Sequence, residues 1–320
     1  MVFPNNATVK GAAAQQLRQQ PNSTRLIFVH TGVPAAVSLV LSLISYLLSL
    51  QIADTGGLGG MDMRSLLETL QSMLQIISSV FSVFWAYGYI RVLLNWSAGT
   101  RAWGSDLLAG FHRWGVVLRS ALLQLLIYIG AMILAMQLAS VVFAMTPLAD
   151  SMMPLVEQIM SDPTFMPTEE QLLDAVVYYL PFMAVAMLAL MLPVFYRLRL
   201  MDFVLMDEPK KGAFYAMRMS ILLMRKNAWK MFRLDLSFWW FYLLEGLAAL
   251  CYYSDMVLQL AGVDLGLSRD GLFFLACVLG LVAQTALYVG CRNRVMLAYA
   301  NVYTDLKKQL HDQLQQPSAI

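Results

Sequence analysis

The sequence predicts an all-α protein, a polytopic membrane helix bundle with six transmembrane helices and both termini in the cytoplasm. The first observation behind this prediction is composition: 59% of the 320 residues are hydrophobic and only 13% are charged. Soluble domains are about 45–50% apolar and about 25% charged. So few polar residues cannot cover a water-soluble body of this size, and the bilayer is therefore the expected solvent. The second observation is the distribution of basic residues among the loops, which gives the orientation.

The apolar residues fall into six stretches, each long enough to cross the membrane, since a helix needs about 20 apolar residues to span the hydrocarbon core. We expect spans at residues 33–53, 70–94, 116–145, 172–196, 236–258 and 272–289. The chain then divides into a cytoplasmic N-terminal segment (1–32), a six-span membrane domain (33–300) and a cytoplasmic tail (301–320). A cleaved signal peptide explains the first stretch poorly, because about 25 mostly polar residues precede it and its apolar run is too long.

Lys and Arg residues place the loops on one side of the membrane or the other. Of the 22 in the chain, only Arg64 and Arg269 fall in the loops that follow the first, third and fifth spans, which leaves 20 on the opposite side. Cytoplasmic loops carry the excess of Lys and Arg in membrane proteins. The sequence therefore predicts a multi-pass protein of the plasma membrane with cytoplasmic termini.

The segment between the fourth and fifth spans predicts a basic amphipathic helix. Apolar residues recur at alternating steps of three and four, which marks one helical face: Phe214, Met217, Ile221, Met224, Ala228 and Met231. Six basic residues fall outside this face: Lys211, Arg218, Arg225, Lys226, Lys230 and Arg233. A basic amphipathic helix joined to a span is expected in the membrane interface. It is either a connector packed on the bundle or a dedicated surface for anionic lipid headgroups or a membrane-protein partner.

Glu245 is the most informative ionisable residue, because it lies about midway along the fifth predicted span. A carboxylate inside the bilayer is costly unless it is protonated or paired, so it is expected to face the bundle interior. Candidate hydrogen-bond partners in other spans are Gln284 and Gln124. This polar site either supports proton- or cation-coupled transport, or locks two helices together as a hydrogen-bonded carboxyl.

Asp235 stands at the cytoplasmic start of the same span, near Arg233. A cap at the positive end of the helix or a local ion pair accounts for it. Arg292 and Arg294, at the end of the sixth span, are further partners if the ends of the last two helical hairpins meet.

The external loop from Thr146 to Gln171 has its own pattern. Residues 152–160 predict a short surface helix, and Thr168 with Gln171 predicts a capping box that opens the fourth span. The carboxylates of this loop lack the spacing of an EF-hand, so no calcium site is expected.

Catalytic and cofactor motifs are missing from the sequence. The three histidines, His30, His112 and His311, are far apart, and there is no zinc-protease helix, nucleophile elbow or P-loop. The three cysteines have no metal-ligand spacing, and a net charge of +2 does not favour nucleic-acid binding. We therefore expect no enzymatic activity and no cofactor or metal.

The run AWKMFRLDLSFW at 228–239 resembles the signature of a bacterial integral membrane family known as domain of unknown function 975. Three further segments are similar to that family: VKGAA at 9–13, residues 196–206 with the DEP turn at 207–209, and NRV at 293–295 followed by Tyr299 and Tyr303. The resemblance implies six-span topology in bacteria and supplies no activity, substrate or functional residue. Glu245 departs from the family, which has mainly apolar residues there.

Taken together, the sequence favours a non-enzymatic integral membrane protein of the bacterial plasma membrane, with a structural role or a role in binding lipid or a partner. The alternative is a small-solute or ion transporter or channel that uses Glu245. A hydrated cavity around Glu245 would favour transport, whereas a dry hydrogen bond would favour the structural role.

Overall fold

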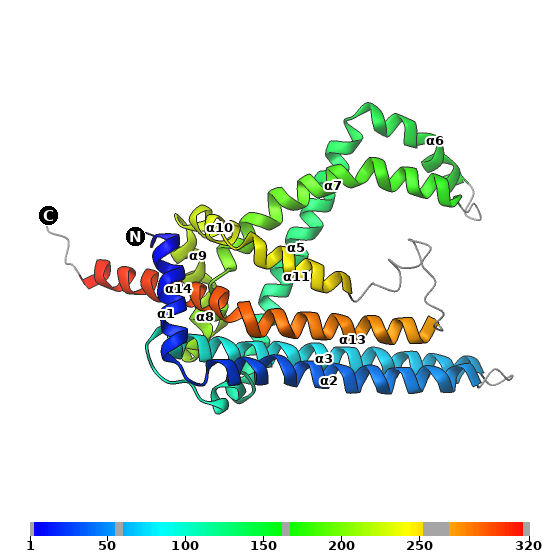
Figure 1. Cartoon of the computed structure of the whole chain (residues 1–320). Helices are drawn as coiled ribbons and strands as arrows, with labels where there is room; N and C mark the ends of the chain where they lie inside the picture. Colours follow the sequence, from blue (N-terminus) through cyan, green and yellow to red (C-terminus); the bar gives the residue numbers. More distant parts are fainter. Residues whose placement is uncertain (1–2, 55–59, 162–166, 252–268, 316–320) are drawn as a thin grey trace.

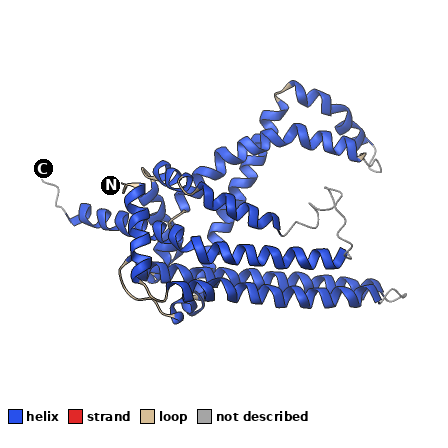
Figure 2. Cartoon of the chain, viewed as in Figure 1, coloured by secondary structure: helices blue, strands red, loops and turns tan. Residues whose placement is uncertain are grey.

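The computed structural model of the chain describes residues 3–54, 60–161, 167–251 and 269–315. Every regular element within these ranges is helical, and none is a strand (Figure 2). The all-α prediction is therefore confirmed for the described part of the chain.

Long helices and short helices alternate along the chain. The first half contains α1 (Asn6–Gln19), α2 (Ser23–Asp54), α3 (Gly60–Ser97), the 3-10 helix η1 (Gly104–Leu108), α4 (Ala109–His112), α5 (Trp114–Ala144) and α6 (Pro147–Ser161). The second half contains α7 (Glu169–Leu198), α8 (Met201–Asp207), the 3-10 helix η2 (Pro209–Lys211), α9 (Gly212–Met224), α10 (Ala228–Leu236), α11 (Trp239–Cys251), α13 (Arg269–Leu287), the π-helical turn η3 (Tyr288–Arg292) and α14 (Asn293–Gln315).

The short helices gather at one end of the molecule and the long helices extend away from them (Figure 1). The helices α1, α8, α9, α10 and α14 lie at this end, and we call this region the basic end. From there α2, α3 and α13 run side by side, while α5 packs along α7. The helix α6 closes the hairpin between α5 and α7 at the opposite end.

The main hydrophobic core lies at the basic end. The helix α8 is its centre, because five of its seven residues are buried: Met201, Phe203, Val204, Leu205 and Met206. Buried residues of α3, α9, α10 and α14 complete it. The long helices, in contrast, expose many large apolar side chains. A bilayer accounts for this division, since lipid tails cover apolar faces that water would not.

Four helical segments of the described chain are long and apolar enough to cross a membrane: Ser23–Leu41, Thr69–Ser97, Trp114–Ala144 and Val176–Asp207. The pair α10 and α11 makes a fifth if it is one span with a bend of 64°. The sixth predicted span coincides with the 19-residue helix α13, which is not among these five. The structure thus shows a helical protein with four or five candidate spans, and the six-span count stays a prediction.

The fifth predicted span, 236–258, is not one straight helix. Its first residue, Leu236, is the last residue of α10, the chain turns at Ser237 and Phe238, and residues 252–258 lie outside the described ranges. The turn is held from α1, because Lys10 Nζ donates to the Ser237 carbonyl at 2.8 Å and lies 4.4 Å from the centre of the Phe238 ring. A freed carbonyl at a helix break is thereby satisfied.

The amphipathic helix predicted before this span is two helices, and its buried face differs from the predicted one. Asn227 separates α9 from α10 and its side chain donates to the Leu223 carbonyl at 2.9 Å. Phe214 and Ile221, assigned to the buried stripe, are 68% and 37% exposed. The buried residues of α9 are Ala213, Ala216, Ser220, Leu223 and Met224, of which Met224 belongs to the predicted apolar face.

The features predicted for the external loop are present. Thr168 Oγ1 accepts from the Gln171 backbone N–H at 3.3 Å, and Gln171 Oε1 accepts from the Thr168 N–H at 3.0 Å. This capping box opens α7, and α6 covers the residues for which a short helix was expected. Both local predictions are confirmed.

The loop after α3 folds back against that helix at two glycines. A Cβ at Gly88 of α3 would lie 1.8 Å from the Leu107 carbonyl oxygen, and one at Gly110 of α4 would lie 2.0 Å from the Phe84 carbonyl oxygen. At each glycine, the backbone of one segment therefore contacts a backbone carbonyl of the other segment. Only residues without a Cβ permit this approach.

Candidate functional site

The six basic residues predicted as a surface are all exposed at the basic end. One of them has a partner: Lys211 Nζ lies 2.7 Å from Glu208 Oε2. The other five form no ion pair with any carboxylate in the described part of the chain, and we call them the α9–α10 basic surface: Arg218, Arg225, Lys226, Lys230 and Arg233. The structure therefore keeps five of the six residues as unpaired surface cations.

Aromatic side chains accompany these cations. Trp229 is 61% exposed and Arg233 lies 5.8 Å from the centre of its ring. Trp239, at the start of α11, is 60% exposed. Exposed Trp next to Arg and Lys is typical of the level of the lipid headgroups, where the ring is half in hydrocarbon and the cation meets phosphate.

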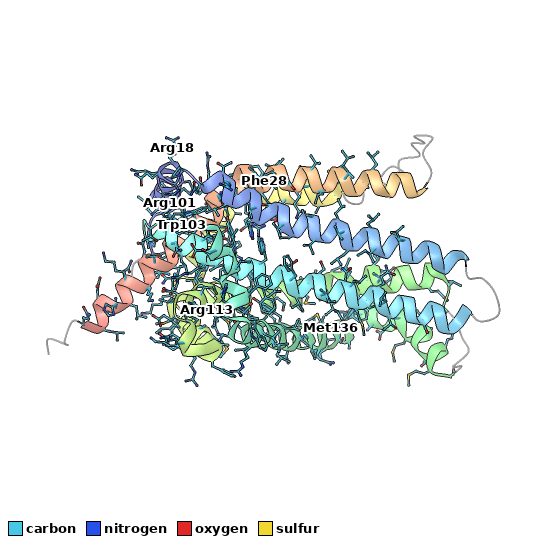
Figure 3. The ribbon with its side chains drawn as sticks, turned by 90° about the horizontal axis from the view of Figure 1, so that it is seen from below. Arg18, Phe28, Arg101, Trp103, Arg113 and Met136 are labelled. Atoms are coloured by element: carbon cyan, nitrogen blue, oxygen red, sulfur yellow. The ribbon has the colours of Figure 1, made fainter. Side chains whose placement is uncertain are left out.

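A smaller group of the same kind lies elsewhere at this end. Arg101 and Trp103, in the loop between α3 and η1, lie at the same end of the molecule as Arg18 of α1, whereas Met136 lies on the long helix α5 (Figure 3). Arg101 lies 4.7 Å from the centre of the Trp103 ring, and both side chains are exposed. Exposed cations beside Trp side chains thus occur at this end of the molecule in two separate parts of the chain.

Glu245 and Gln284, two of the three residues proposed for an intramembrane site, belong to one hydrogen-bonded chain. Tyr288 links them: its hydroxyl donates to Glu245 Oε1 at 2.9 Å and accepts from Gln284 Nε2 at 3.0 Å. The contact joins α11 to α13 and to the first residue of η3. Tyr288 was not among the predicted partners, although its position four residues after Gln284 places it on the same helical face.

Gln124, the third proposed residue, belongs to a different contact. Its Nε2 donates to Asp202 Oδ1, which also accepts from the Tyr87 hydroxyl at 2.6 Å. Tyr87 lies within 3.3 Å of Ser120 Oγ as well. This group ties α3 and α5 to the buried helix α8, so the structure does not bring Gln124 to Glu245.

Asp235 is buried, and its partners are Tyr196, near the end of α7, and Arg199, the residue that follows α7. Tyr196 donates to Asp235 Oδ2 at 2.6 Å, and the Arg199 guanidinium lies 3.9 Å from Oδ1. Oδ1 has no hydrogen-bond partner among the described residues. The ion pair proposed for Asp235 is therefore present, but its cation is Arg199. It is not the neighbouring Arg233 or an arginine at the end of the sixth predicted span.

A charged cluster fastens α14 to the turn after α8. Lys307 Nζ lies 2.6 Å from both Asp207 Oδ2 and Glu208 Oε1, and Tyr303 donates to Asp207 at 2.7 Å. Burial favours the neutral acid at Glu208, but hydrogen bonds from Lys211 and Lys307 outweigh this and lower its pKa to about 2. Burial opposes the charge on Lys307, yet its two carboxylate partners raise its pKa above the ordinary value. We call this cluster the α14 clamp.

Nothing in the described ranges groups three or more His, Cys, Asp or Glu side chains closely enough to hold a metal ion. His30 is buried against Tyr89, with ring centres 4.0 Å apart, and Cys251 and Cys291 are separate free thiols.

The fold and these contacts define a helical membrane protein whose described polar groups join helices at one end and whose free cations face outward. Comparison with protein-family models, with curated proteins and with solved structures found no match. The resemblance of segments 9–13, 196–209, 228–239 and 293–303 to the bacterial family therefore stays a prediction. All four segments contribute buried residues to the core at the basic end.

Proposed function

We propose that this chain is a non-enzymatic, multi-pass protein of the bacterial plasma membrane that binds anionic phospholipid headgroups through the α9–α10 basic surface. The proposal includes six spans, with the basic end in the cytoplasm. The observation that carries it is five exposed cations without carboxylate partners among the described residues, on α9, on α10 and in the turn between them, beside exposed Trp229 and Trp239.

The expected strength follows from electrostatics. Each Lys or Arg near an anionic membrane surface contributes about 1 kcal/mol. Replacing Arg218, Arg225 and Lys226 by glutamine removes about 3 kcal/mol, which corresponds to roughly a 100-fold loss of affinity. None of the three is buried, so the fold itself is expected to survive.

The test measures lipid binding to the detergent-solubilised full chain by native mass spectrometry. Phosphatidylglycerol is titrated against zwitterionic phosphatidylethanolamine, for the wild type and for the triple variant. A matched control replaces three exposed cations outside the surface, Arg18, Arg25 and Lys308, by glutamine. We expect phosphatidylglycerol binding to weaken in the first triple variant and not in the control. Equal weakening in both triple variants would mean that only the net charge of the protein matters, and it would refute the proposed surface.

Transport is the second candidate, and Glu245 is the observation that favours it. Its carboxylate is held by Tyr288 near the middle of the predicted fifth span. A liposome flux assay that compares the wild type with Glu245→Gln tests this function. Flux above that of empty liposomes, and lower in Glu245→Gln, supports transport; background flux in both proteins rules it out.

A further inference from the structure

Three polar side chains form a ladder along the sixth predicted span and the turn that follows it. Gln284, Tyr288 and Arg292 are spaced four residues apart, and Tyr288 bonds to Gln284 on one side and to Glu245 across the interface with α11. Arg292 is the last of these three residues and lies at the basic end. It closes η3, the π-helical turn between α13 and α14. Single π-helical turns are rare and occur frequently at functional sites.

Two tyrosine rings hold the guanidinium of Arg292. Its central carbon lies 4.2 Å from the centre of the Tyr288 ring and 5.9 Å from that of Tyr89. The two rings are themselves fixed, because the Tyr89 hydroxyl donates to Asn293 Oδ1 at 2.6 Å and its face stacks on His30. Aromatic faces orient a guanidinium but leave its planar edge of N–H donors available.

No carboxylate in the described ranges pairs with this guanidinium, although Arg292 is partly buried. Glu245, the nearest acid along the ladder, is engaged by Tyr288. Next to the same ring pair, His30 Nδ1 is buried without a hydrogen-bond partner among the described residues. A partly buried, unpaired cation beside an unsatisfied polar atom is costly unless a counter-charge binds there.

We propose that Arg292 binds a phosphate group, presented either by a phospholipid headgroup or by a soluble phosphate. The guanidinium edge matches two phosphate oxygens, and an arginine in this setting gives two parallel charge-assisted hydrogen bonds. Tyr288 contacts both the Arg292 guanidinium and Glu245. The ligand would therefore bind at the Arg292 end of the ladder, next to the predicted sixth span. This site lies outside the α9–α10 basic surface and does not depend on the proposed function.

The test measures the thermal unfolding midpoint of the full chain in detergent with four additives: phosphatidylglycerol, diacylglycerol of the same acyl chains, inorganic phosphate, and none. A ligand that binds only the folded state raises the midpoint. Arg292→Gln is compared with Arg294→Gln, an exposed arginine one position beyond Asn293. Arg292→Lys keeps the charge but loses the planar fork.

We expect phosphatidylglycerol to raise the midpoint of the wild type and of Arg294→Gln, with an affinity about tenfold or more lower in Arg292→Gln, since hydrogen bonds to charged groups contribute about 1.5–3 kcal/mol. Arg292→Lys is expected between the two. The same pattern with inorganic phosphate assigns the site to a soluble ligand. A response to diacylglycerol equal to that of phosphatidylglycerol, or equal responses of Arg292→Gln and Arg294→Gln, overturns the proposal.

A second measurement serves if Arg292→Gln does not fold. Native mass spectrometry of the wild type then counts phosphate-bearing adducts directly, and Arg292→Lys reports on the guanidinium. A wild type that retains no such adduct, or an Arg292→Lys protein with wild-type affinity, contradicts the assignment.

Discussion

Substituting Gly88 by alanine is expected to destabilise the protein even though the site is inside a helix. An alanine Cβ at position 88 would lie 1.8 Å from the Leu107 carbonyl oxygen, whereas ordinary contacts begin at 3.4 Å. The loop would have to move by about 1.6 Å from α3. Overpacking typically costs about 1–3 kcal/mol, and here the obstacle is backbone and not a flexible side chain. The helix-propensity gain of about 1 kcal/mol does not offset it.

The matched control is Gly130→Ala, also inside a long helix, where an added Cβ meets nothing within 4 Å. It gains helix propensity without a clash and is expected to stabilise by about 0.5–1 kcal/mol. Differential scanning fluorimetry in detergent measures both. We expect the midpoint of Gly88→Ala to fall by roughly 4–8 °C and that of Gly130→Ala to rise by roughly 2 °C. A Gly88→Ala midpoint at or above the wild-type value would refute this account of the loop.

The reciprocal site sharpens the test. Gly110→Ala clashes with the Phe84 carbonyl oxygen across the same interface, at 2.0 Å. Because one displacement of the loop relieves both clashes, the double variant Gly88→Ala, Gly110→Ala is expected to lose less stability than the two single losses added together. Strict additivity would mean that the two glycines serve separate contacts.

Four further predictions concern single contacts. Tyr196→Phe removes the hydrogen bond to the buried Asp235 and should cost about 1.5–3 kcal/mol by thermal unfolding, whereas an unchanged midpoint would mean that the carboxylate is hydrated. Thr168→Ala should cost about 1 kcal/mol and speed amide exchange in the first turn of α7 alone. Glu208→Gln should lower the midpoint at every pH above about 4.5, with the difference fading as the pH falls to about 2, because the pKa of Glu208 is lowered in the folded state. The pKa of Lys307 is raised in the folded state, so its contribution to stability is fully present below its ordinary pKa of 10.5 and is lost only as the pH rises through the higher folded value. Lys307→Met should therefore lower the unfolding midpoint by the same amount between pH 6 and 9. A midpoint difference that shrinks over this range would contradict the α14 clamp.

The long helices could be predicted because they depend on local properties. The fourth predicted span, 172–196, matches α7 at Glu169–Leu198, and the third matches α5 within two residues at each end. Hydropathy over about 20 residues suffices for such elements, since the bilayer imposes a length and satisfies no backbone group. The capping box at Thr168 was predictable for the same reason, because both partners lie within four residues of each other.

The buried face of α9 was not predictable from hydropathy. Periodicity selected the large residues Phe214 and Ile221, which are exposed, whereas the structure buries small residues such as Ala216 and Ser220. Ser220 Oγ reaches the Arg197 carbonyl of α7 at 2.8 Å, a contact that a larger residue would prevent. Near a membrane, large apolar residues are stable in contact with lipid and small residues allow helices to approach.

The polar contacts at the basic end were missed because each one joins segments far apart in the chain. Tyr196, Tyr288 and Tyr303 were available to the sequence analysis only as aromatic residues near span ends, which the interface favours in any membrane protein. In the structure each donates its hydroxyl to a carboxylate on another helix: Asp235, Glu245 and Asp207.

A phenol suits this role for a physical reason. The ring adds apolar area to the core, while the hydroxyl satisfies an acid that would otherwise be buried without a donor. Tyr87 and Asp202 repeat the arrangement at 2.6 Å on α3 and α8. The same chemistry thus links four helix pairs at the end where the spans meet and leaves the surface cations without carboxylate partners. Tyrosine hydroxyls, with Arg199 at Asp235 and Lys307 at Asp207, bind these acids, while the five cations of the α9–α10 basic surface have no carboxylate partner among the described residues. Exposed cations without a carboxylate partner are what binding of anionic headgroups requires.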